Sequence, residues 1–507
     1  MGRTVADEQR GPGYGLGLST RTQMTGYQFL ARRTAMALTR WQVRMEVEPG
    51  RRQALAVVAS VSAASVICLG ALLWSFLSPS GQLNESPIIA DRDSGALYVR
   101  VGDTLYPALN LASARLIAGR ADNPHKVRSA QIAEQPHGPL VGIPGAPSDI
   151  LPTSPSSSSW LICDTVANVQ GVGAPSPVTV TVIDGSPDLN SRRRVLDGPD
   201  AVVLRYNDES WVVRQGRRSR IDAADRAVLL PLGLTPEQVE HARPMSQALF
   251  DALPVGPELA VPFVPEAGRP PAFPNAPGPV GTVFTTPQLA GPQQYSVVLM
   301  DGVQTVSSVV ARILQNAGAT AGGAPVVVAP PELAKMPVVT GLDLSAYPEG
   351  PLKVVDMKEN PSTCWWWERS SGDSRARVQV VSGPTIPVPQ KQINRVVSLV
   401  KTNNNNMPQA DRVYFGPGYG NFVAVTGNDP DASTRESLWW LSASGVRFGV
   451  PGDDERKALG LVSEPALAPS VALRLLAHGP TLSRQDALVR HDTLPTDMSP
   501  AELAVPK

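Results

Sequence analysis

Residues 53–78 read QALAVVASVSAASVICLGALLWSFLS, a stretch of 26 residues without an acidic or basic side chain. A helix rises about 1.5 Å per residue, so this length spans the ~30 Å hydrocarbon layer of a bilayer. Arg52 precedes the stretch and Pro79 follows it. The sequence therefore predicts one transmembrane helix with its boundaries at Gln53 and Ser78.

Two other interpretations of this stretch are less favoured. A cleaved signal peptide begins near the N-terminus and has a shorter apolar core and a small-residue cleavage site. This stretch instead follows some fifty residues and shows no such site. A core helix of a soluble protein would need an unusually long uncharged run.

Residues 1–52 contain nine arginines and no lysine, against four acidic residues, although the whole chain has a formal net charge of zero. Arginine-rich segments next to a membrane helix stay in the cytoplasm. We therefore expect a cytoplasmic head before the span, in the cell inner membrane, and a periplasmic body after it. The neutral total argues against a nucleic-acid-binding protein.

The body is long and rich in turn-forming residues. A chain of 507 residues predicts several folding units, and its 50 prolines are about twice the usual share. Many short strands and helices joined by rigid turns are expected, and few long helices.

Three cysteines are present, and one of them, Cys68, lies inside the apolar stretch. Cys163 and Cys364 both fall in the predicted extracytoplasmic body. A cysteine pair in an oxidising compartment favours a disulfide. Two separate buried thiols are the alternative, and a metal site lacks further ligands at suitable spacing.

Two segments of the body resemble each other. Trp211–Ile221 and Trp440–Val450 share the pattern W-x4-G-x-R-x2-[IV], and Gly-Pro pairs follow both at 256–257 and 479–480. Weaker copies begin at Leu97 and at Tyr295. In each copy, β-rich runs flank a turn and an apolar helical segment follows. The repetition predicts four small α/β repeat domains that pack on one another or on a common scaffold.

Strand-like alternation around Trp160 and after Cys364 predicts a mainly-β central domain that is split by inserted repeats. The fold class is therefore α+β, with a single transmembrane helix. The expected boundaries are a cytoplasmic head at 1–52, the span at 53–78, repeat domains at 80–122, 191–265, 266–330 and 391–490, central-domain parts at 123–190 and 331–390, and a tail at 491–507.

The sequence offers no catalytic, cofactor or metal site. It contains neither a G-x4-G-K-[ST] phosphate loop nor a G-x-S-x-G nucleophile elbow. The five histidines are scattered, and Asp356, Glu359 and Glu368 are best explained as solvated charges. The tryptophans Trp365–Trp367 favour strand packing over the stacking of a glycan.

The cytoplasmic head contains a second helical signal. Apolar residues recur at steps of three and four, and arginines cover much of the remaining surface. Such a helix docks on a partner or on anionic lipid, and a simple orientation signal is the alternative. The predicted docking residues are Tyr27, Leu30, Arg32, Arg33, Leu38, Arg40, Trp41, Arg44 and Met45.

These features together resemble the EccB family of the type VII (ESX) secretion system. The resemblance rests on Tyr27–Arg33 (YQFLARR), on Trp41–Met45 (WQVRM), on the four repeats and on the cysteine pair, and it covers nearly the whole chain. The region of the span and the first repeat is most similar to the paralogue of the fifth ESX system.

The resemblance implies a structural subunit that links cytoplasmic channel subunits to a self-associating periplasmic assembly. Its implied partners are EccC, EccD, EccE, the mycosin protease, the lipid bilayer and further copies of the chain. ATPase activity has been attributed to the family, but no residue pattern here supports it. A cell-wall-binding module and, less favoured, an ATP-hydrolysing enzyme are the alternative functions.

Overall fold

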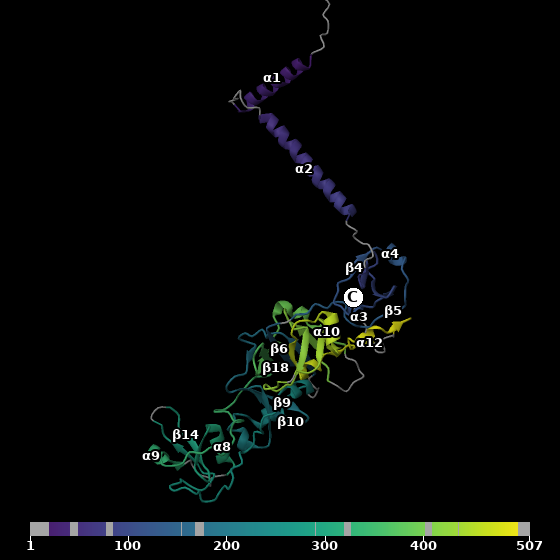
Figure 1. Cartoon of the computed structure of the whole chain (residues 1–507). Coiled ribbons are helices and arrows are strands. Elements are labelled where there is room, and N and C mark those ends of the chain that lie inside the picture. The colour runs from purple at the N-terminus through teal and green to yellow at the C-terminus, as the bar shows by residue number, and fades with distance from the viewer. Residues whose placement is uncertain are drawn as a thin grey trace, which may run out of the picture. The chain divides into compact units, whose positions relative to one another are not determined.

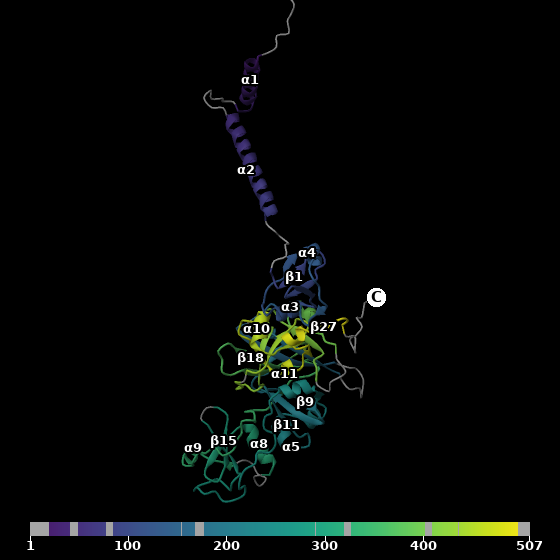
Figure 2. The ribbon, with the colours of Figure 1, turned by 45° about the vertical axis from the view of Figure 1, so that its right-hand side comes forward.

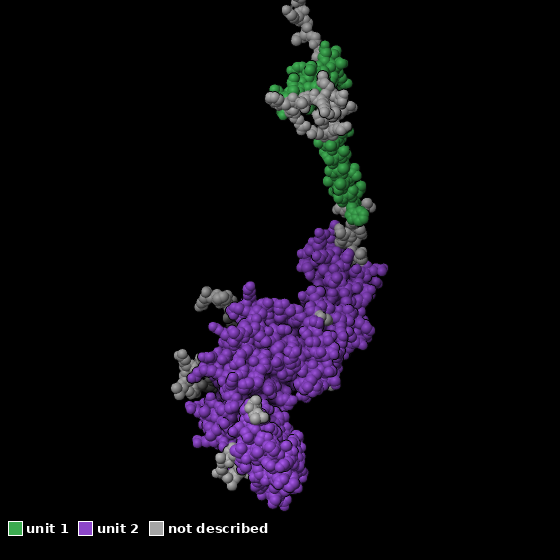
Figure 3. All heavy atoms as spheres, turned by 90° about the vertical axis from the view of Figure 1, so that its left-hand side faces the viewer, with its two compact units in different colours: residues 1–80 green, residues 81–507 purple. Residues whose placement is uncertain are grey.

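The computed structural model describes residues 20–40, 49–77, 85–153, 155–167, 177–288, 291–318, 326–400, 408–433 and 435–494. The chain forms two compact parts, residues 1–80 and the body 81–507 (Figure 3). The first part contains two helices, α1 (Arg21–Arg40) and α2 (Pro49–Leu77). Each part is described by itself below.

Four small sheets of the body share one topology. Three antiparallel strands follow one another along the chain, and a fourth strand pairs parallel with the first. We call the sheets with their helices repeats 1 to 4. Their strands are β1 (Ile88–Asp91), β2 (Leu97–Val101), β3 (Thr104–Pro107) and β4 (His125–Val127) in repeat 1; β9 (Asp200–Tyr206), β10 (Glu209–Arg214), β11 (Arg217–Ile221) and β12 (Arg243–Pro244) in repeat 2; β13 (Val283–Thr286), β14 (Gln294–Val298), β15 (Val303–Val306) and β16 (Val326–Val327) in repeat 3; and β22 (Phe422–Thr426), β23 (Leu438–Leu441), β24 (Val446–Val450) and β25 (Ala466–Pro469) in repeat 4.

A helix follows the third strand of every repeat, and another follows the parallel strand. Side chains accept hydrogen bonds from free N–H groups at several helix starts, as Asn110 does for α3 and Ser307 for α8. The helices are α3 (Leu111–Ala118) and α4 (Ser129–Ala133) in repeat 1; α5 (Arg226–Leu229), α6 (Pro236–Glu240) and α7 (Gln247–Ala252) in repeat 2; α8 (Ser308–Asn316) and α9 (Pro330–Leu333) in repeat 3; and α10 (Asp453–Leu459), α11 (Ser470–Leu473) and α12 (Arg484–Ala487) in repeat 4.

A seven-stranded sheet lies between repeats 2 and 4 and is built from distant parts of the chain (Figure 1). Its order is β20-β21-β7-β6-β18-β19-β8. Its central strands β6 and β18 are buried on both faces over Trp160–Cys163 and Cys364–Trp367, which explains the four consecutive apolar residues in each. The strands are β6 (Ser157–Val166), β7 (Val178–Asp184), β8 (Arg194–Val195), β18 (Ser362–Ser370), β19 (Arg377–Gly383), β20 (Val397–Ser398) and β21 (Arg412–Phe415), and the 3-10 helix η1 (Gln390–Arg395) precedes β20.

Four two-residue strands complete the sheets of the body. Strand β17 pairs with β9 of repeat 2, and β26 pairs with β24 of repeat 4. Strand β27, at the end of the described chain, pairs with β5, which follows repeat 1. Their bounds are β5 (Leu140–Val141), β17 (Lys353–Val354), β26 (Ala477–His478) and β27 (Arg490–His491).

The repeats pack in two pairs. Leu116 of repeat 1 shares one hydrophobic core with Leu459 and Leu482 of repeat 4. Ile313 of repeat 3 packs with Val228 of repeat 2 in a second core. In Figures 1 and 2, repeat 3 lies beyond repeat 2 and away from the central sheet. Repeats 2 and 4 therefore connect the central sheet to the outer repeats.

Several short segments lie outside the expected domain boundaries. Strand β4 belongs to repeat 1 rather than to the central domain, and β20 and β21 belong to the central sheet rather than to the fourth repeat. Leu342, expected in the second central part, packs in the core of repeat 3. Strands of two to four residues carry too little pattern for the sequence to reveal which sheet they join.

Candidate functional site: the membrane anchor, the docking helix and the central sheet

Helix α2 is the one helix in the described ranges that is long and apolar enough to cross a membrane, over Ala54–Trp74. No part of this segment is buried by the rest of the protein, and Trp74 is 77% exposed. Such an apolar surface is costly in water and favourable in lipid. Of the predicted boundaries, Gln53 lies within α2, and Ser78 lies outside the described residues.

The described part of the predicted docking segment forms helix α1. Tyr27, Leu30 and Leu38 fall on one side of a helix with 3.6 residues per turn, and they are 76%, 63% and 82% exposed. The arginines lie on the other side, where the guanidinium of Arg33 stacks on the ring of Phe29 at 4.8 Å. The apolar side is thus free to meet a partner or lipid.

The structure describes only some of the remaining predicted docking residues. Arg32 lies in α1 beside Arg33, and Arg40 is the last residue of the helix. Trp41, Arg44 and Met45 lie outside the described residues. The extension of the apolar side toward the span accordingly stays a prediction.

Cys163 and Cys364 form a disulfide in the middle of the central sheet. The two residues face each other directly on the antiparallel strands β6 and β18, and both are fully buried. The bond joins positions 201 residues apart in the chain. This confirms the predicted bond and its position between distant strands, and it encloses repeats 2 and 3 in one covalent loop.

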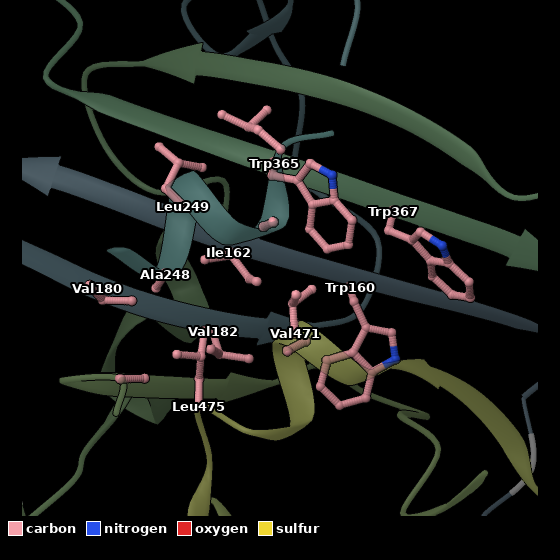
Figure 4. Packing of buried hydrophobic residues seen from close by; sticks show 14 of the residues in the cluster. Trp160, Ile162, Val180, Val182, Ala248, Leu249, Trp365, Trp367, Val471 and Leu475 are labelled. Carbon is pink, nitrogen blue, oxygen red and sulfur yellow. The ribbon is translucent and has the colours of Figure 1, made fainter. Parts of the chain in front are cut away.

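The tryptophans beside the disulfide are buried. Trp365 and Trp367 lie on one face of the sheet with Trp160 of β6 (Figure 4), and Trp366 points to the opposite face, where it packs with Cys364. The exposed fractions of Trp365, Trp366 and Trp367 are 0%, 8% and 1%. A buried ring cannot stack on a glycan, so strand packing is the correct interpretation of this run.

Two helices dock on the tryptophan face of the sheet, α7 from repeat 2 and α11 from repeat 4 (Figure 4 shows Leu249 and Val471). The buried carboxylate of Asp164 on β6 accepts hydrogen bonds from the backbone N–H and the hydroxyl of Ser246, at 2.6 and 2.7 Å. Ser246 in turn caps α7. Burial raises the pKa of Asp164 to about 6, and the nearby Asp411 contributes to the rise.

Helix α11 is held by a neutral group. The side-chain oxygen of Asn428 accepts hydrogen bonds from the Ser470 hydroxyl and the Val471 N–H, both at 3.1 Å. The sequence analysis missed both Asp164 and Asn428. An Asp inside an apolar strand could have signalled the first, whereas nothing local signals the second.

Several open clefts of the body are lined by polar residues of both charges. One, of about 480 Å³, lies between Arg217 of repeat 2 and the β18–β19 hairpin, where Glu368 and Arg377 are 3.9 Å apart. The described ranges hold no group of three or more residues suited to a metal ion. Asp356 accepts a hydrogen bond from the backbone N–H of Lys358 and does not pair with Glu368.

Comparison with protein families gives a match over residues 16–496 to the family described as type VII secretion system ESX-1, transport TM domain B. The chain is 72% identical over 500 residues to the ESX-5 secretion system ATPase EccB5 of Mycobacterium tuberculosis, which covers 98% of this chain and 99% of that protein. The match thus extends over the head, the span and the body.

Solved structures agree with this match. One chain of an intact ESX-5 inner membrane complex is 70% identical, covers 98% of this chain and all of that chain, and has a TM-score of 0.78. One from the periplasmic assembly of the ESX-5 inner membrane complex is 69% identical over 83% of this chain and all of that chain, with a TM-score of 0.75. An EccB3 dimer from the ESX-3 core complex is 36% identical, over 80% of this chain and all of that chain, with a TM-score of 0.71.

Proposed function

This chain belongs to the EccB family of type VII secretion components, and we propose that it is a structural subunit of a type VII inner-membrane complex. In this role it links cytoplasmic channel subunits to a periplasmic assembly that serves protein export. One observation carries the proposal: a protein 70% identical over nearly the full chain is part of an ESX-5 inner membrane complex. A purified membrane complex that lacks this chain would refute it.

The proposed topology is a single pass through the inner membrane, with the head in the cytoplasm and the body in the periplasm. The nine arginines before the span support it, as does the buried disulfide, which requires an oxidising compartment to form. The variants Leu30→Cys and Leu151→Cys, both at exposed positions, report on the two sides. A membrane-impermeant maleimide should label the second and spare the first in intact spheroplasts, and the reverse pattern would contradict the topology.

We assign the apolar side of α1 to docking on the cytoplasmic subunits EccC, EccD or EccE. The support is the exposure of Leu30 and Leu38 on the side away from the arginines. Leu38→Asp should therefore release these subunits from the purified complex. The neighbouring Thr39→Asp introduces the same charge outside the apolar side and is the matched control. Equal retention of the subunits by both variants would argue against docking through this side.

The body is assigned two kinds of partner, further copies of itself and the mycosin protease. Self-association is supported by the dimer of the EccB3 relative. Cross-linking of the complex in membranes should yield body-to-body products and products with the protease. Monomeric bodies under cross-linking would contradict self-association.

We further propose that this subunit does not hydrolyse ATP by itself, although its relative from Mycobacterium tuberculosis is named an ATPase. The chain lacks a phosphate-binding G-x4-G-K-[ST] loop. Purified full-length protein should show no ATP hydrolysis above a boiled control. Hydrolysis that a single point substitution removes would overturn this assignment, and co-sedimentation with peptidoglycan would instead favour the cell-wall-binding alternative.

A further inference from the structure

Each repeat returns to the free edge of its third strand through a short segment that follows the helix after its parallel strand. In repeat 2, Arg218 N–H donates to Pro254 and Gly256 N–H donates to Arg218, at 3.0 and 2.7 Å. In repeat 3, the same two bonds join Val303 to Pro337 and Val339, at 2.8 and 3.0 Å. These bonds fix which residues of the repeats correspond.

The correspondence exposes one difference among the repeats. By the same hydrogen bonds, the return segments align as residues 136–139, 254–257, 337–340 and 477–480. Their sequences are Pro-His-Gly-Pro, Pro-Val-Gly-Pro, Pro-Val-Val-Thr and Ala-His-Gly-Pro. Repeats 1, 2 and 4 therefore end in a proline (Pro139, Pro257 and Pro480), and repeat 3 alone has a residue with an N–H group there, Thr340.

Proline at this position has a physical consequence. The bonds to the third strand use the carbonyl of Pro337 and the N–H of Val339, so the main-chain groups of Val338 and Thr340 point to the opposite, outer side. Proline lacks an N–H donor, and proteins place it on strand edges to prevent pairing with another strand. Three repeats are guarded in this way, and repeat 3 is not.

The outer edge of repeat 3 is open in the described structure. Within the described ranges, the N–H groups of Val338 and Thr340 have no hydrogen-bond partner, and the Val338 side chain is 77% exposed. Repeat 1 shows that a strand can be added just beyond this point. In repeat 1, strand β27 pairs with Leu140 and Val141, the two residues after Pro139. The equivalent residues of repeat 3, one and two positions after Thr340, are Gly341 and Leu342.

A hollow of about 600 Å³ lies next to this edge, and its acidic lining indicates that a strand bound there carries positive charge. Thr340, Gly341 and Leu342 line it, and its charged lining residues are the acids Asp343 and Glu349. Hydrogen bonds from Ser345 lower the pKa of Asp343, which keeps this carboxylate ionised. An added strand would present every second side chain to one face of the sheet, so a basic side chain can reach these acids.

We propose that the edge Val338–Thr340 of repeat 3 is a docking site for an extended polypeptide segment of another protein that carries a lysine or arginine. The segment adds to the sheet beside the return segment of repeat 3 by main-chain hydrogen bonds, as peptides do in β-augmentation. This surface is separate from helix α1 and does not depend on the proposed role of that helix.

The test uses the full chain purified in detergent and a fluorescent, end-capped peptide, Thr-Val-Arg-Val-Arg-Val-Thr, followed by fluorescence anisotropy. Thr340→Pro should weaken binding at least tenfold because it removes one of the two outer donors of the edge. The fold should tolerate this variant, since the other three repeats carry proline at this position. An unchanged thermal unfolding midpoint checks that it does.

Two controls make the result specific. Val255→Pro removes the remaining outer donor of repeat 2, which corresponds to that of Val338. It should leave binding unchanged, because Pro257 already blocks pairing at this edge. A peptide with glutamate in place of both arginines should bind at least tenfold more weakly to the unsubstituted chain, and Glu349→Gln should reduce that preference.

Three outcomes would overturn the proposal. The first is equal binding of the arginine peptide by the unsubstituted chain and by Thr340→Pro. The second is no binding of this peptide by the unsubstituted chain at millimolar concentration. The third is a change in oligomeric state caused by Thr340→Pro, which would assign the edge to a second copy of this chain.

Discussion

Two junctions join the repeats into pairs, repeat 1 with repeat 4 and repeat 3 with repeat 2. In both, the helix after the third strand of one repeat packs on the other repeat, but the polar contacts of the two helices differ. Helix α3 of repeat 1 packs on repeat 4, and helix α8 of repeat 3 packs on repeat 2, in both cases through apolar side chains. Arg115 and Arg312 each lie five residues after the capping residue of their helix. Arg115 is buried, whereas Arg312 is exposed.

The buried arginine joins repeat 1 to repeat 4. Its guanidinium donates to the carbonyl oxygens of Leu459 at 3.3 Å and Ile150 at 3.4 Å. Strand β27 adds main-chain hydrogen bonds to β5 at the same junction. Across the other junction, an exposed bond of 3.4 Å joins Asn316 to the carbonyl of Ala227. The comparison teaches that α3 brings a buried arginine to its junction, whereas α8 contributes mainly apolar packing. There the polar contact comes from repeat 2, whose Arg214 donates to the carbonyl of Ala346 at 2.8 Å.

The attachments to the central sheet show a parallel difference. Repeat 2 is held through the ionisable Asp164. Repeat 4 is held through neutral groups, because Leu467 of β25 donates its N–H to the Ser158 hydroxyl and accepts from the Trp160 ring N–H, at 2.9 and 3.1 Å. Repeats 2 and 3 therefore form the pair whose attachment should respond to pH, and the disulfide lies at the base of the loop that contains them. Four experiments test this contrast.

The largest effect is expected from removal of the disulfide. The double variant Cys163→Ala/Cys364→Ala should lower the free energy of unfolding of the central sheet by about 2–5 kcal/mol, because the bond restricts a long loop of the unfolded chain. Thermal unfolding of the purified chain measures this loss. Cys68→Ala, in the span, is the control, and equal midpoints for the double variant and the control would contradict a stabilising bond.

The next effect concerns Asp164. Its pKa in the folded chain, about 6, lies above the ordinary value of 3.8, so the folded state binds an extra proton between these values. The contribution of Asp164 to stability should therefore fall as pH rises from about 4 to 6, by about 3 kcal/mol in total. Asp164→Asn removes this dependence.

The thermal unfolding midpoints of the unsubstituted chain and of Asp164→Asn are measured across this pH range and subtracted. The difference isolates the effect of Asp164, because the contributions of all other titrating residues are the same in both proteins. A difference that stays constant between pH 4 and 7 would show that Asp164 does not titrate as its burial requires.

A smaller effect separates the two equivalent arginines. Arg115→Ala should cost about 2 kcal/mol, because buried carbonyl acceptors lose their donor. Arg312→Ala should stay within about 0.5 kcal/mol, as exposed substitutions usually do. Thermal unfolding of the two variants side by side measures the contrast, and equal losses would remove the distinction between the junctions.

The smallest effect is expected from strand β27. A chain ending at Leu488 loses the two-residue pairing with β5, which should cost about 1 kcal/mol. Hydrogen exchange should then accelerate at Gly142, whose N–H donates to the carbonyl of Val489. Unchanged protection of Gly142 would indicate that β27 contributes nothing to this junction.

Much of the architecture could be predicted from local signals. The uncharged run before Pro79 identifies the span because length and apolarity suffice for a helix that lipid surrounds. The W-x4-G-x-R pattern identified repeats 2 and 4, since it encodes a hairpin whose turn glycine has a positive φ, 77° at Gly216 and 86° at Gly445. The cysteine pair indicated which distant strands meet.

The attachments could not be predicted in this way. Asp164 and Ser158 act on residues 82 and 309 positions away along the chain, and no local pattern specifies such distances. The short strands β4, β20 and β21 were expected in the wrong domains, because two to four residues fit the edge of any sheet.

The sequence by itself determined one membrane helix, an arginine-rich head and a body of related α/β units, because composition and periodicity act within a few residues of each other. The tertiary structure alone decided how the units are used. Arg115 and Arg312 occupy the same helix position with the same side chain, and only the neighbouring repeat makes one a buried contact and leaves the other in solvent. Likewise, Thr340 reads as an ordinary residue until the hydrogen bonds of the return segment show that it stands where the other repeats have proline.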